Sequence, residues 1–310
     1  MYVPLWAWFA VIAGVVALLL VDLLVFHREA HEVSMGEAAR SSAMWIAIGV
    51  AFGAGVWVVA GAERGGEWFA GYLIEKALAV DNIFVFAVIL GAFAVPKALQ
   101  HRVLFFGVLG ALVLRGAFIA AGATLLSTFS WIMYVFGAFL VFTGVKLVRG
   151  TEHTSDPLES RSMRALRRVV PVTDSYDGQR FFVRRDGRRW ATPLLAVLVA
   201  IETSDLVFAV DSIPAIFAVT DEPFIVFTSN AFALLGLRAL YFLLAGAVDR
   251  FTFLGLGLAA VLVFVGAKML LIDVVHIPIG LSLGVIVGIL AVAIGASMTR
   301  GASTQEVRPG

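Results

Sequence analysis

Long apolar stretches separated by short polar connections run along this chain from one end to the other. Each stretch is close to the ~20 residues that an α-helix needs to cross the hydrocarbon core of a bilayer. The third and sixth stretches differ from the rest because they carry charged residues near their middle. The pattern predicts an all-α polytopic membrane protein with about nine transmembrane helices, at residues 4–26, 41–61, 67–95, 103–126, 131–148, 191–218, 224–246, 251–272 and 278–297.

The composition agrees with this fold class. Hydrophobic residues make up 61% of the chain and charged residues 15%, and the mean hydropathy is +0.96. The first stretch has no basic segment ahead of it and is longer than the apolar part of a signal peptide, so we expect it to remain as a helix. The lipid bilayer is therefore expected to be the main solvent of this protein.

Lysine and arginine are spread unevenly over the predicted connections. Nearly all of them fall on one side, with the largest group between residues 149 and 190, whereas Arg64 falls on the other side. Short cytoplasmic loops carry an excess of these residues. We therefore expect the N-terminus outside and the C-terminus in the cytoplasm. The net charge of +1 hides this asymmetry and gives no reason to expect a nucleic-acid partner.

The basic connection at 149–190 is expected to be cytoplasmic and to face anionic lipid. Part of it is amphipathic and could form a helix on the membrane surface, and Asp186-Gly187 suits the turn of a β-hairpin. It could cover the cytoplasmic mouth of the protein or serve as a plain linker. Sequence alone leaves both open.

The chain contains no cysteine, which excludes disulfides, thiolate metal ligands and cysteine nucleophiles. His27 and His31 are spaced to share a metal on a helix, but plain interfacial histidines at a helix end are the favoured explanation. Asp22, at the inner end of the first span, could line an exit or reach the interface. We find no nucleophile with a base and no nucleotide-binding loop, so we expect neither an enzyme nor a prosthetic group.

Three short motifs occur twice in the same order. "AVDNI" at 79–83 returns as "AVDSI" at 209–213, "LVLR" at 112–115 as "LGLR" at 235–238, and "VFTGVKL" at 141–147 as "VFVGAKM" at 263–269. Each unit holds three predicted spans, an odd number, so the second copy would cross the membrane in the opposite sense. The pattern predicts an inverted 3+3 helix repeat, as in many transporters, unless the matches arose by chance in apolar helices.

The repeat divides one membrane domain, residues 1–310, into parts. The first two spans lie in 1–62, and the last span with a cytoplasmic tail lies in 278–310. The two repeats occupy 67–148 and 191–272, joined by the connection at 149–190.

Acidic residues are concentrated at equivalent places in the two repeats. Charged groups in the middle of a membrane are costly and normally face a cavity, a partner or an ion. Bare ion pairing with neighbouring basic residues is the alternative. The candidate metal ligands are Glu75, Asp81, Asn82, Glu202, Asp205, Asp211 and Ser212, and the candidate charge partners are Lys76, Arg115, Lys146, Arg238 and Lys268.

Helical geometry limits how these acids can meet. Glu75 and Asp81 are six residues apart, as are Asp205 and Asp211, which places each pair about 120° apart around an unbroken helix. Pro214 cannot donate to the carbonyl four residues before it. We therefore predict a helix break at 210–214 that would supply a further carbonyl ligand, and a weaker distortion at 81–82.

Hard oxygen ligands without thiolates favour Mg²⁺, Ca²⁺ or Mn²⁺ and do not separate these three ions. Several carboxylates in one site hinder each other's ionisation, which would favour exchange of the metal for protons. Arg115 and Arg238 could neutralise the acids, repel a second cation, or form simple ion pairs.

Longer motifs resemble the TerC family of integral membrane proteins, and its Alx-type members in particular. They are "LIEKALAVDNIFVF" at 73–86, "VPVTDSYDGQRFFVRRDGRRWATPL" at 170–194, "IETSDLVFAVDSIPAIFAVTDEPFIVFTSN" at 201–230 and "LLGLRALYFLL" at 234–244. The resemblance implies a bacterial cytoplasmic-membrane protein of metal homeostasis that exports manganese. It also implies that the family's essential intramembrane acids correspond to Glu75, Asp81, Glu202, Asp205 and Asp211.

Three functions follow as hypotheses. The first is a secondary transporter that exports Mn²⁺ by alternating access, with proton coupling as an open feature. The second is a non-transporting membrane scaffold or sensor in a stress (tellurite) resistance complex, with purely structural buried charges. The third is a transporter or channel for another cation such as Ca²⁺ or H⁺. Protein partners are not indicated.

Overall fold

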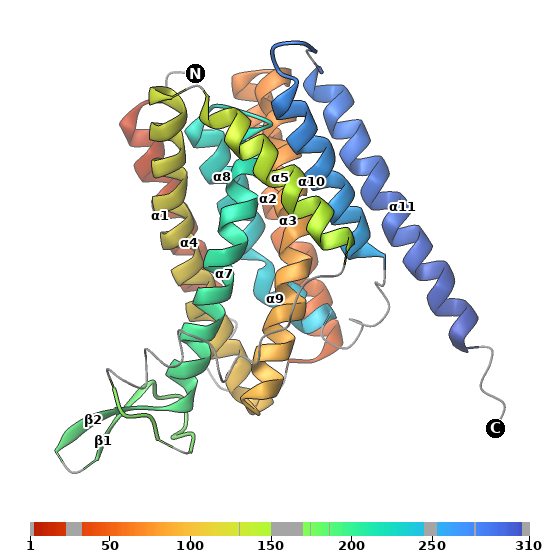
Figure 1. Ribbon diagram of the computed structural model, residues 1–310. Coiled ribbons are helices and arrows are strands. Elements are labelled where there is room, and N and C mark those ends of the chain that lie inside the picture. The colour runs from red at the N-terminus through yellow and green to blue at the C-terminus, as the bar shows by residue number, and fades with distance from the viewer. Residues whose placement is uncertain are drawn as a thin grey trace.

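A computed structural model describes residues 3–22, 33–129, 131–149, 170–173, 175–185, 187–244, 253–275 and 277–305. In these ranges the chain forms a helix bundle with a two-stranded ribbon at one end (Figure 1). The helices are α1 (Leu5–Val21), α2 (Met35–Ala60), α3 (Ala62–Ala92), α4 (Lys97–Thr128), α5 (Ile132–Val148), α7 (Pro193–Phe217), α8 (Pro223–Leu235), α9 (Leu237–Leu244), α10 (Leu254–Leu270) and α11 (Ile279–Gln305), and the strands are β1 (Phe182–Arg185) and β2 (Arg188–Ala191).

The helices agree with a polytopic membrane protein. Among the described residues, four helices are long and apolar enough to cross a membrane, or five if α8 and α9 count as one bent span. α1, α5 and most of α10 are apolar but shorter. Every predicted span overlaps a described helix or the α8–α9 pair. Nine membrane crossings stay a prediction. α3 is not among the helices that are both long and apolar enough to cross, and α1, α5 and α10 are too short.

Chain direction alternates from helix to helix. In Figure 1, α3 descends, α4 ascends and α5 descends, whereas α7 ascends, α8 and α9 descend and α10 ascends. We call the lower end the ribbon end, because β1 and β2 lie there before α7 begins. The upper end is called the far end, where α4 leads to α5 and α7 leads to α8.

α5 and α10 cross at close range because small residues line their contact. A Cβ atom at Gly144 of α5 would lie 2.8 Å from the carbonyl oxygen of Ala259. A Cβ at Gly266 of α10 would likewise lie 2.6 Å from the carbonyl oxygen of Gly137. Backbone can approach backbone this closely only where no side chain stands between them.

The span predicted at 224–246 is interrupted. α8 and α9 meet at Gly236 with a bend of 42°. The Lys76 ammonium donates to the carbonyl oxygen of Ala233 at 2.7 Å, in the last turn of α8. Helix ends leave carbonyls without an intrahelical partner, so this lysine supplies a donor at the bend.

α7 is continuous where a break was expected. Its helix runs through Pro214 and ends at Phe217, and α3 likewise continues through residues 81–82. Proline removes one backbone donor, and Pro214 lies in the last turn of α7. A helix packed among others tolerates this loss. The predicted break is therefore replaced by an unbroken helix.

The basic connection contains the hairpin that the sequence predicted, and residues 151–169, including the possible surface helix, lie outside the described residues. β1 and β2 pair antiparallel around Gly187, which has a φ of +75°. The base of this ribbon is fixed to the bundle by Tyr176, whose hydroxyl donates to the carbonyl oxygen of Phe93 at 2.7 Å. Burial raises the pKa of Tyr176, so the hydroxyl remains a donor at neutral pH.

Candidate functional site: a buried charge cluster between α3 and α7

Polar side chains from two antiparallel helices meet in the middle of the bundle. α3 supplies Glu75 and Asn82, and α7 supplies Asp205 and Ser212. Residues seven apart lie about 20° from each other around a helix, so each pair shares one face. All four side chains are buried. α3 and α7 therefore each direct two polar side chains to the same place, although neither helix has the break that the sequence had suggested.

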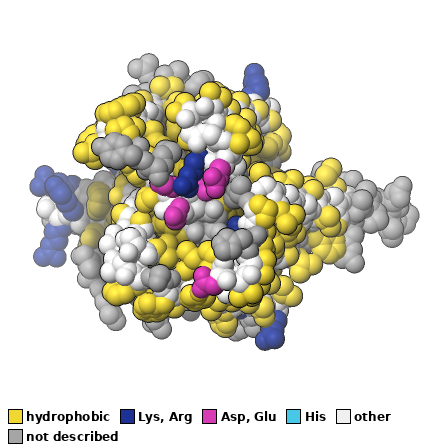
Figure 2. Space-filling model, turned by 90° about the horizontal axis from the view of Figure 1, so that it is seen from above, with side chains coloured by type: hydrophobic (Ala, Val, Ile, Leu, Met, Phe, Trp, Pro, Cys, Tyr) yellow, Lys and Arg dark blue, Asp and Glu magenta, His cyan; other side chains and the backbone are white. Residues whose placement is uncertain are grey.

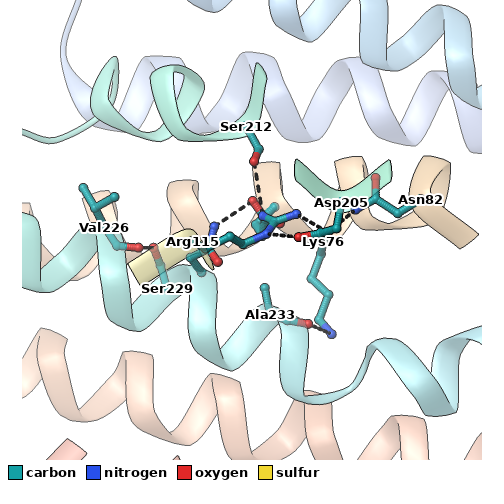
Figure 3. A network of polar contacts seen from close by, with 10 residues as sticks. Lys76, Asn82, Arg115, Asp205, Ser212, Val226, Ser229 and Ala233 are labelled. Carbon is teal, nitrogen blue, oxygen red and sulfur yellow. Dashed lines mark hydrogen bonds and ion pairs between the residues drawn. The ribbon is translucent and has the colours of Figure 1, made fainter. Parts of the chain in front are cut away.

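Arg115 of α4 is the centre of this cluster (Figure 3). Its guanidinium forms an ion pair with Glu75 and binds both oxygens of Asp205, through Nη2 at 3.0 Å and Nε at 3.2 Å. It also donates to the Ser212 hydroxyl at 3.2 Å. Arg115 and Asp205 are each 1% exposed and Glu75 is 0% exposed. One positive charge thus serves two carboxylates in a site shielded from solvent.

Two amides complete the cluster. Asn230 of α8 donates to the second oxygen of Glu75 at 3.1 Å, and Asn82 donates to Asp205 at 3.5 Å. The Asn82 carbonyl oxygen Oδ1 is buried and has no hydrogen-bond partner in the described structure. A buried acceptor without a donor is costly, and a cation or a donor would satisfy it.

Glu202 lies beside this cluster but outside its hydrogen bonds. It comes one turn before Asp205 on α7, toward the ribbon end, and the two carboxylates repel each other. Its carboxylate packs on α4, where a Cβ at Gly110 would lie 2.0 Å from Oε1. Its second oxygen, Oε2, is buried and has no partner among the described groups. Glu202 therefore contributes a second orphaned acceptor oxygen.

Asp81 and Asp211 have described backbones but side chains that lie outside the described part of the structure. Their backbones adjoin Asn82 and Ser212. Among the side chains that are described, no group of three or more histidines or acids could by itself hold a metal. His27 and His31 also lie outside the described residues.

The other predicted charge partners go elsewhere. Arg238 forms an ion pair with Asp22, which joins α9 to the end of α1. Lys268 is attracted electrostatically to Glu67 near the far end. Lys146 is exposed in the last turn of α5, and Lys76 serves the bend at Gly236. Among the predicted partners, Arg115 forms ion pairs with the candidate acids Glu75 and Asp205. Lys76 is also attracted electrostatically to Glu75, its neighbour along the chain.

Sequence reasoning missed Asn230 as a site residue. The signal was present, because "TSN" at 228–230 places three polar residues in succession in an apolar helix. Thr228 accepts from the Trp68 indole at 3.1 Å, and Asn230 binds Glu75. Polar side chains within a membrane helix normally find a partner on a neighbouring helix.

A second polar region lies at the far end. Figure 2 looks down on this end, where acidic side chains gather around a basic one. Arg64 forms ion pairs with Glu67 at 2.8 Å, Glu222 at 3.2 Å and Asp221 at 3.6 Å. A cavity of about 610 Å³ at this end is lined by Asp221 and Asp273 together with apolar side chains that include Phe217.

The comparison with known proteins decides the family. The chain matches the description "Integral membrane protein TerC family" over residues 60–305. This chain belongs to the TerC family.

Relatives within the TerC family match nearly the whole chain. A membrane protein of Myxococcus xanthus, STKORF319, is 54% identical over 96% of this chain and 92% of its own. Alx of Escherichia coli K12, named as a candidate membrane-bound redox modulator, is 50% identical over 92% of this chain and 91% of its own. A Rickettsia bellii membrane protein is 40% identical over 95% of this chain and 97% of its own. No solved structure matches the chain.

These matches confirm the resemblance found in the motifs and place the protein in a membrane. The side of the membrane on which each terminus lies stays a prediction.

Proposed function

We propose that this TerC-family protein is a secondary transporter that exports a divalent cation, Mn²⁺, from the cytoplasm. In this proposal the two three-helix repeats, residues 67–148 and 191–272, alternate the access of a cation site between them. The acids and amides of the Arg115 cluster, together with Glu202, Asp81 and Asp211, form that site. Mn²⁺ is the cargo that the family resemblance implies, and it is not a resident cofactor.

The observation that carries the proposal is the position of Arg115. A buried positive charge is held at the same time by Glu75 of one repeat and Asp205 of the other. Removing a guanidinium from water is costly unless its surroundings bind it strongly. The interface between the two repeats therefore has the charge and the oxygen donors that bind a cation.

Cargo at Glu75 and Asp205 would have to compete with Arg115. Two carboxylates satisfied by one guanidinium would need that group to move aside before they could bind Mn²⁺. The orphaned oxygens, Asn82 Oδ1 and Glu202 Oε2, lie on the same helices and remain available as ligands. Oxygen donors of this kind suit Mn²⁺, Mg²⁺ or Ca²⁺, so selectivity among them has to be measured.

Two features support the inverted repeat. The three helices of the first unit run opposite to their counterparts in the second (Figure 1). In the motif alignment Gly144 is equivalent to Gly266, and Gly137 to Ala259. The close contacts obey the same equivalence, because Gly144 abuts the Ala259 carbonyl while Gly266 abuts the Gly137 carbonyl. An approximate twofold relation between α5 and α10 would produce this reciprocity.

A path to the far end follows from α7. Phe217 is five residues beyond Ser212, which is about 7.5 Å along a helix. Its ring packs on α4, where a Cβ at Gly122 would lie 2.9 Å from it. Beyond Phe217 lies the cavity with Asp221 and Asp273. In the proposal Phe217 closes this path, and the acidic cavity receives the cation.

A non-transporting role is the second candidate, and one observation favours it. Arg115 and Asn230 already satisfy Glu75, and Arg115 and Asn82 satisfy Asp205, as a structural charge cluster would require. Relatives named as candidate redox modulators fit this reading. With no cysteine in the chain, redox modulation through thiols would need a partner that supplies them.

Transport in liposomes separates the two candidates. Purified protein is reconstituted with a metal-sensitive dye inside, and uptake of Mn²⁺, Ca²⁺ and Mg²⁺ is followed with and without an imposed pH gradient. The proposal expects Mn²⁺ flux in the wild type and its loss in Glu75→Gln and Asp211→Asn. A dependence on the pH gradient would establish proton coupling.

The matched control is Glu63→Gln, which removes an exposed acid from the first turn of the same helix. It should transport like the wild type. Absence of metal flux in a folded wild-type protein would leave the scaffold role. Faster flux of Ca²⁺ than of Mn²⁺ would keep the transporter and change its cargo.

A further inference from the structure

The ribbon formed by β1 and β2 concentrates positive charge in an unusual way. Its register places Arg184 opposite Arg189 and Arg185 opposite Arg188. Like charges directly opposite each other destabilise a strand pair, and an isolated two-stranded ribbon is marginal to begin with. Arg184, Arg188 and Arg189 are exposed. An anionic partner at the tip would remove this repulsion.

The ribbon base is held firmly against the bundle. The Arg102 guanidinium of α4 lies over the rings of Phe106 and Phe181, at 5.6 and 5.7 Å from their centroids, and donates to the Gln179 side chain at 2.8 Å. The Thr192 hydroxyl donates to the carbonyl oxygen of Arg180 at 2.7 Å, directly before α7 begins. The ribbon is thus a supported arm that leads straight into α7.

The arm points sideways from the ribbon end of the bundle. In Figure 1 it extends to the lower left, past the neighbouring helices. Figure 2 shows a group of Lys and Arg side chains at the left edge, on the side to which the arm extends in Figure 1. Because the helices cross the membrane, an arm extending sideways from their ends lies over the surrounding lipid headgroups.

The side chains of the arm match that location. Phe182 is 52% exposed and shares a strand face with Arg184, while Trp190 shares the other face with Arg188. Aromatic and basic residues together are typical of the membrane interface, and arginine binds phosphate through two donors at once. Zwitterionic headgroups would leave the excess positive charge uncompensated.

We propose that the β1–β2 ribbon is a lipid-binding arm whose arginines hold anionic phospholipid headgroups on the ribbon side of the membrane. The headgroups neutralise the opposed arginines and fix the arm to the membrane surface. Since the arm continues into α7, bound lipid also restrains the end of the helix that carries Asp205. The proposal goes beyond transport and stands whether or not the protein moves a cation.

A spin label can test this directly because the chain has no cysteine of its own. Phe182→Cys is labelled with a nitroxide, and the full-length protein is placed in nanodiscs of phosphatidylcholine with increasing phosphatidylglycerol. The expected result is a label that becomes ordered and shielded from a water-soluble relaxation agent as phosphatidylglycerol increases. High salt should reverse the change, since screening weakens such contacts.

Variants of the opposed pair sharpen the test. Each arginine at an anionic surface contributes about a fivefold gain in the membrane-bound population, so Arg184→Gln with Arg189→Gln should lower that population about 25-fold. Arg184→Lys with Arg189→Lys should largely retain it. The matched control is Arg40→Gln with Lys97→Gln, which removes two exposed charges from α2 and α4 outside the arm.

Four results would overturn the proposal. The label could respond equally in discs with and without phosphatidylglycerol, the glutamine pair could leave the response intact, or the control pair could abolish it to the same extent. Ordering of the label by a soluble polyanion such as RNA, but not by phosphatidylglycerol, would also overturn it and assign the arm another partner. Every variant is first checked for an unchanged thermal transition.

Discussion

Arg115 and Arg238 occupy equivalent places in the two proposed repeats, yet they bind different partners. Arg115 lies on the unbroken α4 and joins one acid from each repeat. Arg238 lies just after the bend between α8 and α9 and pairs with Asp22 of the N-terminal segment. The same residue type therefore connects α3, α4 and α7 in one place and connects α9 to α1 in the other.

In the proposed repeat the arginine is retained, but its partners differ between the two copies. The bend at Gly236 alters the course of the helix just before Arg238. Asp22 forms an ion pair with Arg238, and Glu37 attracts Arg238 electrostatically, whereas Glu75 and Asp205 both form ion pairs with Arg115. A site built from both halves can thus be asymmetric, with one arginine at the interface and one outside it.

The largest effect is expected from Arg115→Met. The substitution leaves Glu75 and Asp205 buried close together without the guanidinium that pairs with both, which should lower the free energy of unfolding by about 3–5 kcal/mol. Thermal unfolding in detergent measures the loss. Adding Glu75→Gln and Asp205→Asn to the same chain should recover much of it. A single Arg115→Met variant as stable as the wild type would contradict the central role of this arginine.

Arg238→Met should cost less, because it breaks the ion pair with Asp22, whereas Arg115→Met breaks ion pairs with both Glu75 and Asp205. Loss of a hydrogen bond to a charged group corresponds to about 1.5–3 kcal/mol. Asp22→Asn should have a similar effect, and the double variant should cost less than the sum of the two single ones. Equal losses from Arg115→Met and Arg238→Met in the same thermal assay would contradict the distinction between the two ion pairs of Arg115 and the ion pair of Arg238 with Asp22.

Gly144→Val and Gly266→Val test the reciprocal contacts of α5 and α10, which the proposed repeat relates to each other. Each inserts a side chain against a backbone carbonyl of the opposite helix, and overpacking costs about 1–3 kcal/mol. Because the contacts are reciprocal, the two losses of stability should be similar in thermal unfolding. Gly255→Val is the control, since nothing lies within 4 Å of a Cβ at that position. A large loss at only one of the two glycines would weaken the twofold relation.

Asp221→Asn should have the smallest effect. Asp221 is 84% exposed and lies 3.6 Å from Arg64, and exposed ion pairs contribute about 0–1 kcal/mol. Any loss should disappear at high salt, where exposed charges are screened. If Asp221→Asn lowered the thermal stability as much as Arg238→Met, burial would not explain the difference between the Arg64–Asp221 and Arg238–Asp22 ion pairs.

Much of the fold could be predicted from the sequence. The apolar pattern located every described helix of the bundle. The repeated motifs drew attention to the acidic segments of α3 and α7, where Glu75 and Asp205 meet at Arg115. The pattern did not indicate the bend at Gly236, because the apolar stretch continues through it. The bend is seen only in the structure. The sequence also suggested a helix break at Pro214, whereas α7 continues through this proline.

The candidate site was less predictable than the fold. Spacing along one helix indicates which side chains share a face, but it does not say which neighbouring helix faces them. Asn230, Arg115 and Asp22 could be noted as polar residues in apolar surroundings, whereas their partners lie on other helices. Lys146 and Lys268 carried the same signal and lie away from the Arg115 cluster.

The sequence by itself indicated a membrane protein, the positions of its helices and the recurrence of acids in two similar segments. Hydropathy and internal similarity can be read from the linear pattern of residues. Only the tertiary structure decided which cation meets which carboxylate. That choice depends on how α3, α4, α7 and α8 approach one another, and in a low-dielectric interior a few ångströms of approach determine whether a charge is held or left unpaired.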